Sequence, residues 1–447
     1  MPDDTPAACS GAVLYQCFVR QHGPNGTLAD VTADIPRIAA LGATVLYLMP
    51  LHPIGERGRK GSVGSPYAIR DYRAIDPALG TEQDFADLVG AAKAHGLRVM
   101  LDVVFNHTAQ DSVLVAEHPE FFHQDDQGNP ISTVPAWTDI IDLNHDAPGL
   151  ADYLIDCLQG WVDRGVQGFR CDVASLVPLT FWQRARAEVA ARQPDVWWLT
   201  ESPHPNWVTH RREIGLPTDA DPQMFAAFDM SYQYDLWPIW QSAVRGDVGV
   251  ARFLESVRMQ RALLPEHAVK LRYVENHDNY RIMRFARNRE SALAWTALMA
   301  FLPGPFMIFA GQESGTAHWP ELFERDPIDW GTYPLTPFFR QLTAISAARS
   351  GVWRVVASEP VPQLAWADAE GGMLGIFDVH GQGSAAVSLP DGTYRDLYGE
   401  QAIVAGGQVA LSAPMAVLRY EGPLEFEHEF SPLLDTFFQV ELGDDLG

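Results

Sequence analysis

The stretch Gly168-Phe169-Arg170-Cys171-Asp172 ends a short apolar segment and precedes a pattern typical of a helix. If this segment is a strand, Arg170 and Asp172 point to the same face, because side chains alternate along a strand. A guanidinium beside a carboxylate keeps the carboxylate ionised and fixes its orientation, which a nucleophilic or charge-stabilising carboxylate requires. An Arg-x-Asp pair on a strand is more often structural than functional. Its meaning therefore depends on the segments around it.

Seven further apolar segments surround this one, and helical patterns separate them. Helical patterns cover, for example, Thr81–His95, Leu150–Asp163 and Pro178–Arg192. Strands that alternate with helices in this way predict an α/β protein whose main domain is a (β/α)8 TIM barrel. In such a barrel the reactive residues lie on loops at the carboxyl ends of the strands. The predicted strands are Ala12–Gln16, Thr44–Met49, Arg98–Val104, Val166–Cys171, Val196–Thr200, Ala226–Met230, Leu271–Val274 and Phe306–Ala310.

Two regions depart from the barrel pattern. Residues 108–148 are rich in Asp, His, Pro and aromatic residues and are too long for an ordinary crossover, so they predict a small inserted subdomain after the third strand. From about residue 350, short alternating segments with turn signals such as Pro390-Asp391-Gly392 predict a C-terminal antiparallel β domain. The predicted limits are thus 1–107 with 149–349 for the barrel, 108–148 for the insert, and 350–447 for the β domain with its acidic tail.

The composition bounds the class of partner. The chain has 447 residues, of which 47% are hydrophobic and 20% charged, so it can bury a large core. Its 32 Lys and Arg residues against 57 Asp and Glu residues give a formal charge of −25. This charge argues against nucleic acid, anionic membranes and polyphosphates as partners. A well-solvated acidic surface is its more common cause.

Three observations predict a cytoplasmic protein. The segment 1–6 carries no basic residues followed by an apolar core, so no signal peptide is expected. The longest apolar run, around Trp295 to Ala310, is broken by Pro303-Gly304-Pro305, so no membrane span is expected. Scattered cysteines without metal-binding spacing predict free thiols in a reducing compartment and no zinc site. These cysteines are Cys9, Cys17, Cys157 and Cys171.

Three more of the predicted strands end in chemically versatile residues. Asn106-His107 follows the third strand and offers groups for sugar hydroxyls or, through the Asn carbonyl, for a metal. Glu201 follows Trp197-Trp198 in the fifth strand, and an apolar neighbourhood would raise the pKa of its carboxyl, which suits a general acid. Asn276-His277-Asp278 follows the seventh strand. Each feature alone is more often structural, but together they indicate an active site at the barrel mouth.

In this order the segments resemble the hallmark segments of the α-amylase superfamily of retaining glycoside hydrolases. The resemblance runs from about Gly11 to the C-terminal domain. Three supporting segments agree with it, one of them carrying the sugar-stacking tyrosine of the family. The four hallmark segments are Asp102–His107, Gly168–Asp172, Glu201 and Asn276–Asp278, and the supporting segments are Gly42–Pro53, Ser65–Tyr72 and Ile141–Asn144.

The resemblance implies a role for each matching residue. Asp172 corresponds to the nucleophile, Glu201 to the general acid/base and Asp278 to the transition-state stabiliser. The acid would protonate the glycosidic oxygen while the nucleophile attacks the anomeric carbon, and water would later release the covalent glycosyl-enzyme. Four further residues are implied to bind the sugar or position the nucleophile: Tyr67, His107, Arg170 and His277.

Departures from the family's pattern bear on substrate and metal. Many α-amylases carry Ala-x-Lys-His directly after the nucleophile, and this chain has Val173-Ala174-Ser175-Leu176 there. At these positions it therefore lacks the lysine and histidine that bind the reducing-side sugar and calcium in those enzymes. Gly64 stands where exo-acting α-glucosidases typically carry Asp, which argues against a blind pocket. No cofactor is expected for the chemistry. A structural calcium stays open, with Asn106 as the candidate ligand.

Aromatic residues outside these motifs are candidates for stacking on sugars. Trp137, Trp207 and Trp237 are three such residues, although buried or edge tryptophans are the commoner case. The segment Phe323–Trp330 follows the last predicted strand. It would either shape the leaving-group side of the mouth or pack as a loop anchored by Trp330.

We therefore expect a retaining hydrolase of α-1,4-glucosidic bonds in maltodextrins or related α-gluco-oligosaccharides, with α-1,6 bonds as a further candidate. A glucanotransferase of the same family is the first alternative, since a sugar hydroxyl would only replace water in the second step. A carbohydrate-binding homologue without turnover is the second alternative. Loss of one of the three carboxylates would be its signature, and the sequence retains all three.

Overall fold

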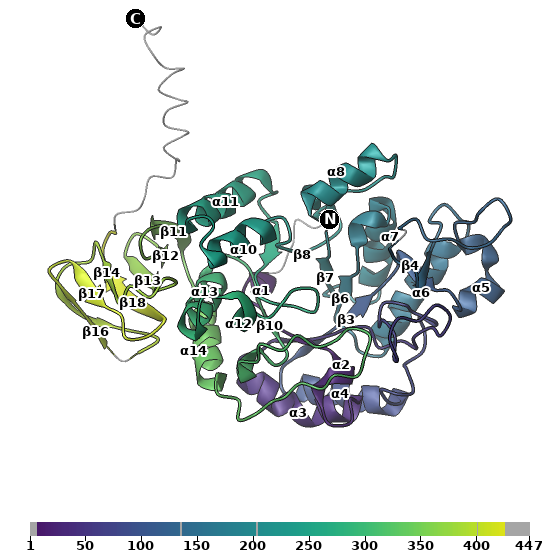
Figure 1. Cartoon of the computed structure of the whole chain (residues 1–447), viewed down its shortest axis with the longest axis horizontal. Coiled ribbons are helices and arrows are strands. Elements are labelled where there is room, and N and C mark those ends of the chain that lie inside the picture. Colours follow the sequence, from purple (N-terminus) through teal and green to yellow (C-terminus); the bar gives the residue numbers. More distant parts are fainter. Residues whose placement is uncertain (1–6, 135, 203, 400, 425–447) are drawn as a thin grey trace, which may run out of the picture. The chain divides into compact units, whose positions relative to one another are not determined.

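The computed structural model describes residues 7–134, 136–202, 204–399 and 401–424 (Figure 1). The described parts of Met1–Asp235, Leu264–Arg284 and Pro303–Ala344 form one compact unit, and Leu236–Leu263, Phe285–Leu302 and the described part of Ile345–Gly447 form another. The predicted acidic tail lies outside the described residues. The predicted limits 1–107 with 149–349, 108–148 and 350–447 stay a prediction.

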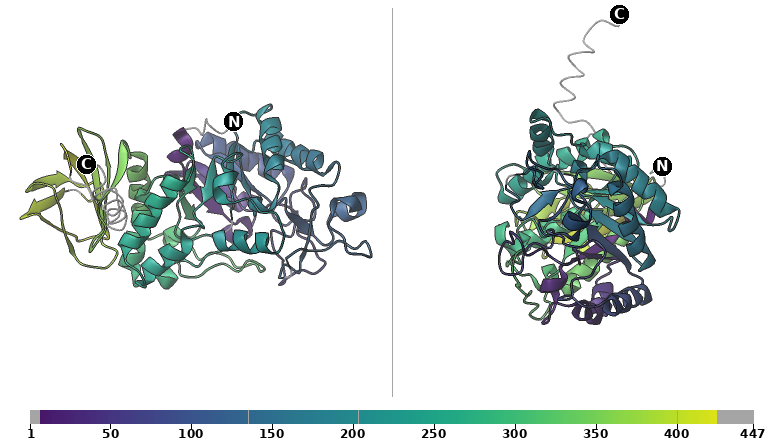
Figure 2. Two further views of the ribbon diagram at one scale, coloured as in Figure 1. Left: turned by 90° about the horizontal axis from the view of Figure 1, so that it is seen from above. Right: turned by 90° about the vertical axis from the view of Figure 1, so that its right-hand side faces the viewer.

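A parallel eight-stranded sheet is the centre of the first unit (Figure 2). Its ends are joined where Arg272 N donates to Pro305 O and Met307 N donates to Arg272 O, both at 2.8 Å. Nearly every strand residue is buried, as expected for a sheet covered on both faces. The predicted (β/α)8 barrel is confirmed. In sheet order the strands are β10 (Phe306–Phe309), β1 (Val13–Cys17), β2 (Val45–Leu48), β3 (Arg98–Val103), β6 (Gly168–Cys171), β7 (Trp197–Thr200), β8 (Met230–Tyr232) and β9 (Val269–Leu271).

Helices alternate with these strands along the chain. The fourth helix shows why they begin where they do: Thr81 Oγ1 accepts from Asp84 N at 3.2 Å, and Asp84 Oδ2 accepts from Thr81 N at 2.7 Å. This reciprocal capping box satisfies backbone N–H groups of the first turn. The helices are α1 (Ala7–Ser10), α2 (Val19–His22), α3 (Leu28–Ala40), α4 (Glu82–Ala94), α6 (Leu150–Asp163), η3 (Ala174–Leu176), α7 (Leu179–Ala190), α8 (Pro205–Glu213), α9 (Asp221–Met224), α12 (Ile282–Phe285), η4 (Gln312–Ser314) and α14 (Thr336–Ala347).

Two predicted strands are displaced from the observed ones. The strand β9 ends at Leu271, so the predicted strand Leu271–Val274 overlaps it at one residue only. The other is the predicted strand Ala226–Met230. Within Ala226–Met230, Phe228 N donates to Met224 O at 3.0 Å, so this segment turns at the end of α9 rather than extending. The strand β8 begins only at Met230, which pairs with Leu199. The apolar run that suggested a strand is buried as a turn in the core. Short apolar runs do not distinguish these two cases by periodicity.

The segment between β3 and α6 contains a small antiparallel sheet of β4 (His107–Ala109) and β5 (Ile140–Asp142). Two short helices lie between these strands, α5 (Val113–Glu117) and η2 (Pro119–Phe121). Ala109 and Ile140 form a buried cluster with Ala68. Because Tyr67 directly precedes Ala68, this cluster fixes the insert beside the loop that carries Tyr67.

The second unit contains helices and two four-stranded antiparallel sheets. In α13 (Arg289–Phe301) every residue from Ser291 to Phe301 is buried. Trp366 Nε1 donates to Phe301 O at 2.8 Å, and the rings of Phe301 and Phe377 lie 5.4 Å apart. The predicted C-terminal antiparallel β structure is confirmed. The other elements are α10 (Trp237–Arg245), α11 (Val250–Leu263), β11 (Val352–Ala357), β12 (Gln363–Ala367), β13 (Gly371–Phe377), β14 (Ser384–Ala386), β15 (Gly392–Arg395), β16 (Gln401–Ala405), β17 (Gln408–Ala410) and β18 (Met415–Glu421).

Two global properties bear on the sequence-based expectations. In the part of the chain that the structure describes, every helix is too short or too polar to cross a membrane. The cysteines are free thiols and all are buried: Cys9, Cys17, Cys157 and Cys171.

Candidate active site

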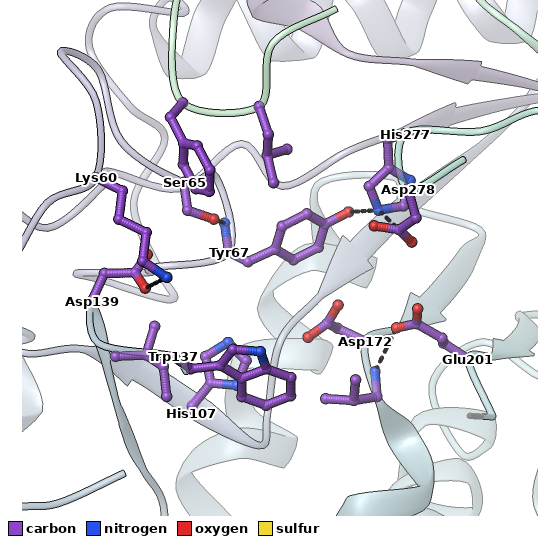
Figure 3. Close-up of a pocket in the computed structure, with 14 residues that line it drawn as sticks. Lys60, Ser65, Tyr67, His107, Trp137, Asp139, Asp172, Glu201, His277 and Asp278 are labelled. Atoms are coloured by element: carbon purple, nitrogen blue, oxygen red, sulfur yellow. Dashed lines mark hydrogen bonds and ion pairs between the residues drawn. The ribbon is translucent and has the colours of Figure 1, made fainter. Parts of the chain in front are cut away.

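A cavity of about 280 Å³ lies at the carboxyl ends of the barrel strands (Figure 3). The structure brings together in its lining all of the predicted catalytic and substrate-binding residues except Arg170, which lies buried next to Asp172. The predicted lining residues are Tyr67, His107, Asp172, Glu201, His277 and Asp278, and the others are Lys60, Ser65, Trp137, Asp139, Ile140, Val173, Leu322 and Phe323.

Arg170 lies among three carboxylates. Its Nη1 donates to Asp102 Oδ1 at 2.8 Å and to Asp172 Oδ1 at 2.9 Å. Its Nη2 lies 2.8 Å from Glu201 Oε2. The register of the parallel strands explains this arrangement, because Asp102 on β3 pairs directly with Arg170 on β6, and β7 lies next to β6 and leads into Glu201. One fully buried guanidinium thus orients carboxylates from three neighbouring strands.

Burial shifts the pKa of two of these carboxyl groups, those of Asp102 and Asp172. It raises the pKa of Asp102 to about 6, although the charge of Arg170 opposes the rise. Burial likewise raises the pKa of Asp172 well above its usual range, again against the charge of Arg170 and with the charge of Glu201 adding to the rise. The sequence predicted that Arg170 keeps Asp172 ionised. The charge of Arg170 does favour the ionised form, but desolvation and the neighbouring carboxylates favour the protonated form more strongly.

Val173 has a backbone conformation that β-branched residues rarely adopt, with φ at 35° and ψ at 42°. This left-handed turn directs its N–H toward Glu201, and Val173 N donates to Oε2 at 2.8 Å. Arg170 Nη2 lies 2.8 Å from the same oxygen, so polar partners hold the carboxylate. The Trp198 ring packs against Phe169, 5.4 Å between centroids. The indole surroundings expected for Glu201 stay a prediction. Strain of this kind is typical of functional sites.

His277 and Tyr67 form a polar chain along one wall of the cavity. Gln16 Nε2 donates to His277 Nδ1 at 2.8 Å, and His277 Nε2 lies 2.7 Å from the Tyr67 hydroxyl. Burial, helped by the charge of Arg170, lowers the pKa of His277 to about 3. The ring is therefore neutral with its proton on Nε2, which donates to Tyr67. The Tyr67 hydroxyl in turn donates to Asp102 Oδ2 at 3.1 Å.

Asp278 is the most open of the three predicted carboxylates, with 43% of its side chain exposed. Its Oδ2 accepts from the Tyr234 hydroxyl at 2.8 Å, and its backbone N donates to Asn276 Oδ1 at 3.0 Å. Asn276 Nδ2 also donates to the Tyr234 hydroxyl at 2.9 Å. These bonds fix the carboxylate at the cavity wall.

Sequence reasoning missed the residues that support the site from behind. Asp102 stands within a hallmark segment, and its position four residues before Asn106 was the signal that could have identified it. Tyr47 donates to Asp102 Oδ2 at 2.7 Å from the neighbouring strand β2. Tyr47 lies within the supporting segment Gly42–Pro53, but the sequence did not indicate its contact with Asp102. Gln16 and Tyr234 belong to no motif, so only the barrel brings them to the site.

The candidate metal ligand Asn106 has its side-chain nitrogen 3.2 Å from His107 Nδ1. Its backbone oxygen accepts from Leu143 N at 3.0 Å. Within the described residues, His, Cys, Asp and Glu form no group of three or more that could hold a metal ion. Calcium at Asn106 stays a prediction.

Of the tryptophans proposed as sugar platforms, Trp137 lines the cavity, with its ring 5.6 Å from that of His107. Trp237 is buried in the second unit against Trp240, 4.5 Å between ring centroids. Trp207 lies on α8, next to His210. Trp137 is therefore the one whose position suits a bound sugar.

Solved structures of amylases are similar to the whole described fold. An α-amylase from Lactobacillus plantarum is 36% identical with a TM-score of 0.87, over 92% of this chain and 99% of that one. A noncanonic maltogenic α-amylase, AmyB from Thermotoga neapolitana, is 27% identical with a TM-score of 0.80, over 92% and 99% of the two chains.

A curated relative is a transferase by name. The α-1,4-glucan:maltose-1-phosphate maltosyltransferase 2 of Streptomyces coelicolor (strain ATCC BAA-471 / A3(2) / M145) is 34% identical over 247 residues, which are 50% of this chain. The match spans 35% of that relative, so the chain covers about a third of the length of the curated relatives that it matches.

The model of the alpha amylase catalytic domain family matches residues 9–128 and 136–333, which include every site residue described above. The barrel, the match to the family model and the similarity to the amylase structures agree, and the chain belongs to the α-amylase family of enzymes that act on glycosidic bonds.

Proposed function

We propose that the protein cleaves α-1,4-glucosidic bonds in α-gluco-oligosaccharides with retention of configuration, with Asp172 as nucleophile, Glu201 as general acid/base and Asp278 as transition-state stabiliser. The observation that carries this proposal is the convergence of Asp172 and Glu201 on Arg170 in the wall of the cavity. Glycoside cleavage requires a pair of carboxyl groups that flank the reacting centre, and retention requires the two groups to be close, as the partners of one guanidinium are.

The hydrogen bonds of the two carboxyl groups suggest which oxygens react. Arg170 binds Asp172 Oδ1, so Oδ2 would form the bond to the anomeric carbon. Val173 N donates to Glu201 Oε2, and Arg170 Nη2 forms an ion pair with the same oxygen. The other oxygen, Oε1, would therefore carry the proton that passes to the glycosidic oxygen. The C–O bond then breaks as the Asp172–carbon bond forms, and the leaving sugar departs with the proton.

In the second step Glu201 would act as base on an incoming water. The water attacks the anomeric carbon, the bond to Asp172 breaks, and Glu201 regains its proton. Asp278 would stabilise the positive charge that develops on the sugar in both steps. Tyr67 would stack under the ring, and neutral His107 and His277 would bind its hydroxyls.

A glucanotransferase is the second candidate, because the curated relatives are named maltosyltransferases and transfer passes through the same covalent intermediate. A maltose 1-phosphate donor suits this cavity less well than a neutral sugar. Its lining carries four carboxylates, and Lys60 is the one lysine or arginine among the described lining residues. Lys60 is already paired with Asp139 at 2.8 Å. Such a surface repels a phosphate dianion.

The cytoplasmic location predicted from the sequence belongs to this proposal as well. Its support is the burial of free thiols, which is common in a reducing compartment.

The test is to incubate maltoheptaose with the wild type and with Asp172→Asn. Shorter sugars alone indicate hydrolysis, and additional longer sugars indicate transfer. Asp172→Asn should lower the rate by about a thousandfold or more, since the nucleophile is lost, with little change in thermal unfolding. No turnover by the folded wild type would favour the carbohydrate-binding alternative, and activity surviving in Asp172→Asn would contradict the assignment of the nucleophile.

A further inference from the structure

Lys60 and Asp139 form an ion pair in the cavity lining, with Lys60 Nζ 2.8 Å from Asp139 Oδ1. Lys60 comes from the loop between β2 and α4, and Asp139 comes from the insert, directly before β5. The Asp139 side chain is only 7% exposed. Lys60 Nζ also donates to Ala136 O at 3.3 Å and lies 5.9 Å from the centre of the Phe323 ring.

The segments that carry this pair are bound to one another. Val63 N and Gly64 N, just after Lys60, both donate to Phe323 O at 3.1 Å. Ser62 N donates to Glu324 Oε1 at 2.8 Å. Gly61 permits this close approach, since a Cβ there would lie 2.7 Å from Phe323 Cβ. The loop after β2 and the loop after β10 therefore form one continuous wall with the insert.

Figure 3 shows Lys60 and Asp139 at one end of the site and Glu201 at the other, with Tyr67 between them. An acid at Glu201 protonates the oxygen of the leaving group, so the leaving group must lie at the Glu201 end. The part of the substrate that bonds to Asp172 then extends away from Glu201. Its non-reducing end points toward Lys60 and Asp139.

We propose that the Lys60–Asp139 pair is the end wall of the donor side, so that the enzyme removes short units from the non-reducing ends of α-glucans rather than cleaving within the chain. This rests on the proposed function. The cavity of about 280 Å³ lies near the lower limit of the roughly 300–1,000 Å³ typical of ligand pockets, which suits a short donor. The ammonium can donate to terminal sugar hydroxyls and the carboxylate can accept from them.

The proposal replaces two expectations from the sequence. Gly64 suggested an open cleft, but the wall is built by residues at other positions, four residues earlier and in the insert. One of the two alternatives for the segment Phe323–Trp330 placed it on the leaving-group side of the barrel mouth. Phe323 lies beside Lys60, which is at the opposite end from Glu201.

The direct test compares wild-type rates on a maltoheptaoside with a free non-reducing end and on the same compound with that end blocked by a cyclic acetal. The blocked end cannot fit against the wall, so the free compound should react about a hundredfold faster or more. Equal rates, with products from internal cleavage, would overturn the proposal.

The matching variant is Lys60→Ala/Asp139→Ala. Both residues are changed together because removal of Lys60 alone would leave the buried Asp139 charge unpaired. The double variant should cleave the blocked compound at least about tenfold faster than the wild type does, and it should release longer fragments from the non-reducing end of the substrate. An unchanged rate in a folded double variant would overturn the proposal. Arg73→Ala/Asp156→Ala, which removes an exposed ion pair of 2.9 Å, is the control and should leave the product pattern unchanged.

If the double variant does not fold, Asp139→Asn keeps the shape of the wall and breaks the ion pair. It should raise KM for the free-ended compound with kcat nearly unchanged, because only the contact with the substrate end is altered, and an unchanged KM would count against the proposal. Failure of the proposed function looks different from failure of this inference. In the first case the wild type leaves both compounds intact, and in the second it cleaves both at equal rates.

Discussion

Arg170 shows how much of the site depends on one side chain. It is completely buried and lies within hydrogen-bonding distance of Asp102, Asp172 and Glu201. In Arg170→Met the three carboxyl groups would lose their common counterion. The free energy of unfolding should fall by about 3–5 kcal/mol, measured by urea denaturation.

The control for this variant is Arg73→Met. Arg73 pairs with Asp156 at 2.9 Å on the surface, with half of its side chain exposed. Loss of this pair should change the free energy of unfolding by less than about 1 kcal/mol. Equal losses in the two variants would contradict the structural importance assigned to Arg170.

The buried His52 should make the free energy of unfolding depend on pH, and a single substitution can isolate this contribution. Burial lowers its pKa to about 4, and Nδ1 lies 3.2 Å from Ala74 O. In the unfolded chain the pKa is about 6.5, so between these values the unfolded state binds a proton that the folded state does not. The histidine therefore destabilises the fold progressively as the pH falls from 6.5 to 4.

In His52→Gln this loss should be absent. The difference between wild type and variant in unfolding free energy should be constant above pH 6.5. It should shift by up to about 3 kcal/mol in favour of the variant by pH 4, measured by urea denaturation across the range. A difference that is independent of pH would contradict the buried, neutral state of His52.

At the scale of elements, α13 and β13 of the second unit are expected to unfold together. Phe377 on β13 is fully buried, and its ring lies 5.4 Å from that of Phe301 on α13. Phe377→Ala should cost about 3–5 kcal/mol through the cavity it leaves. It should also accelerate hydrogen exchange in α13 and β13 alike, because they share this contact.

Ile403, which is 66% exposed on β16, provides the control. Ile403→Ala should change stability by less than about 0.5 kcal/mol and leave exchange in α13 unaltered. If Phe377→Ala accelerates hydrogen exchange in β13 alone, the β domain unfolds independently of α13. That result would agree with the domain boundary predicted at residue 350.

The elements also show what the sequence could predict. The strands β3 and β6 could be located because each ends in a chemically distinctive motif. The helices α4 and α6 could be located because their apolar residues recur with helical spacing. The strand β8 was misplaced because Ala226–Met230 is apolar for a different reason, burial in a turn. The Lys60–Asp139 pair could not be predicted, since the two residues lie in separate irregular loops and only the closed barrel brings them together.

At the scale of the whole molecule, the barrel brings residues that are distant in sequence to one proposed reacting centre. Asp172, Glu201 and Asp278 stand at the ends of β6, β7 and β9 or just beyond, and parallel strands of a closed barrel deliver their carboxyl ends to the same face. This face carries the chemistry in barrel enzymes generally. The specific claim for this protein is that the chemistry passes through a covalent bond to Asp172.

The most direct test of that claim is to trap the covalent intermediate. The wild type is incubated with an activated maltosyl fluoride carrying a fluorine on its ring, which slows release more than formation of the glycosyl-enzyme, and the protein is digested and analysed by mass spectrometry. The account predicts one added glycosyl unit on the peptide that contains Asp172, and none in Asp172→Asn. A label on another carboxylate, or steady release of product with inverted configuration and no label, would contradict it.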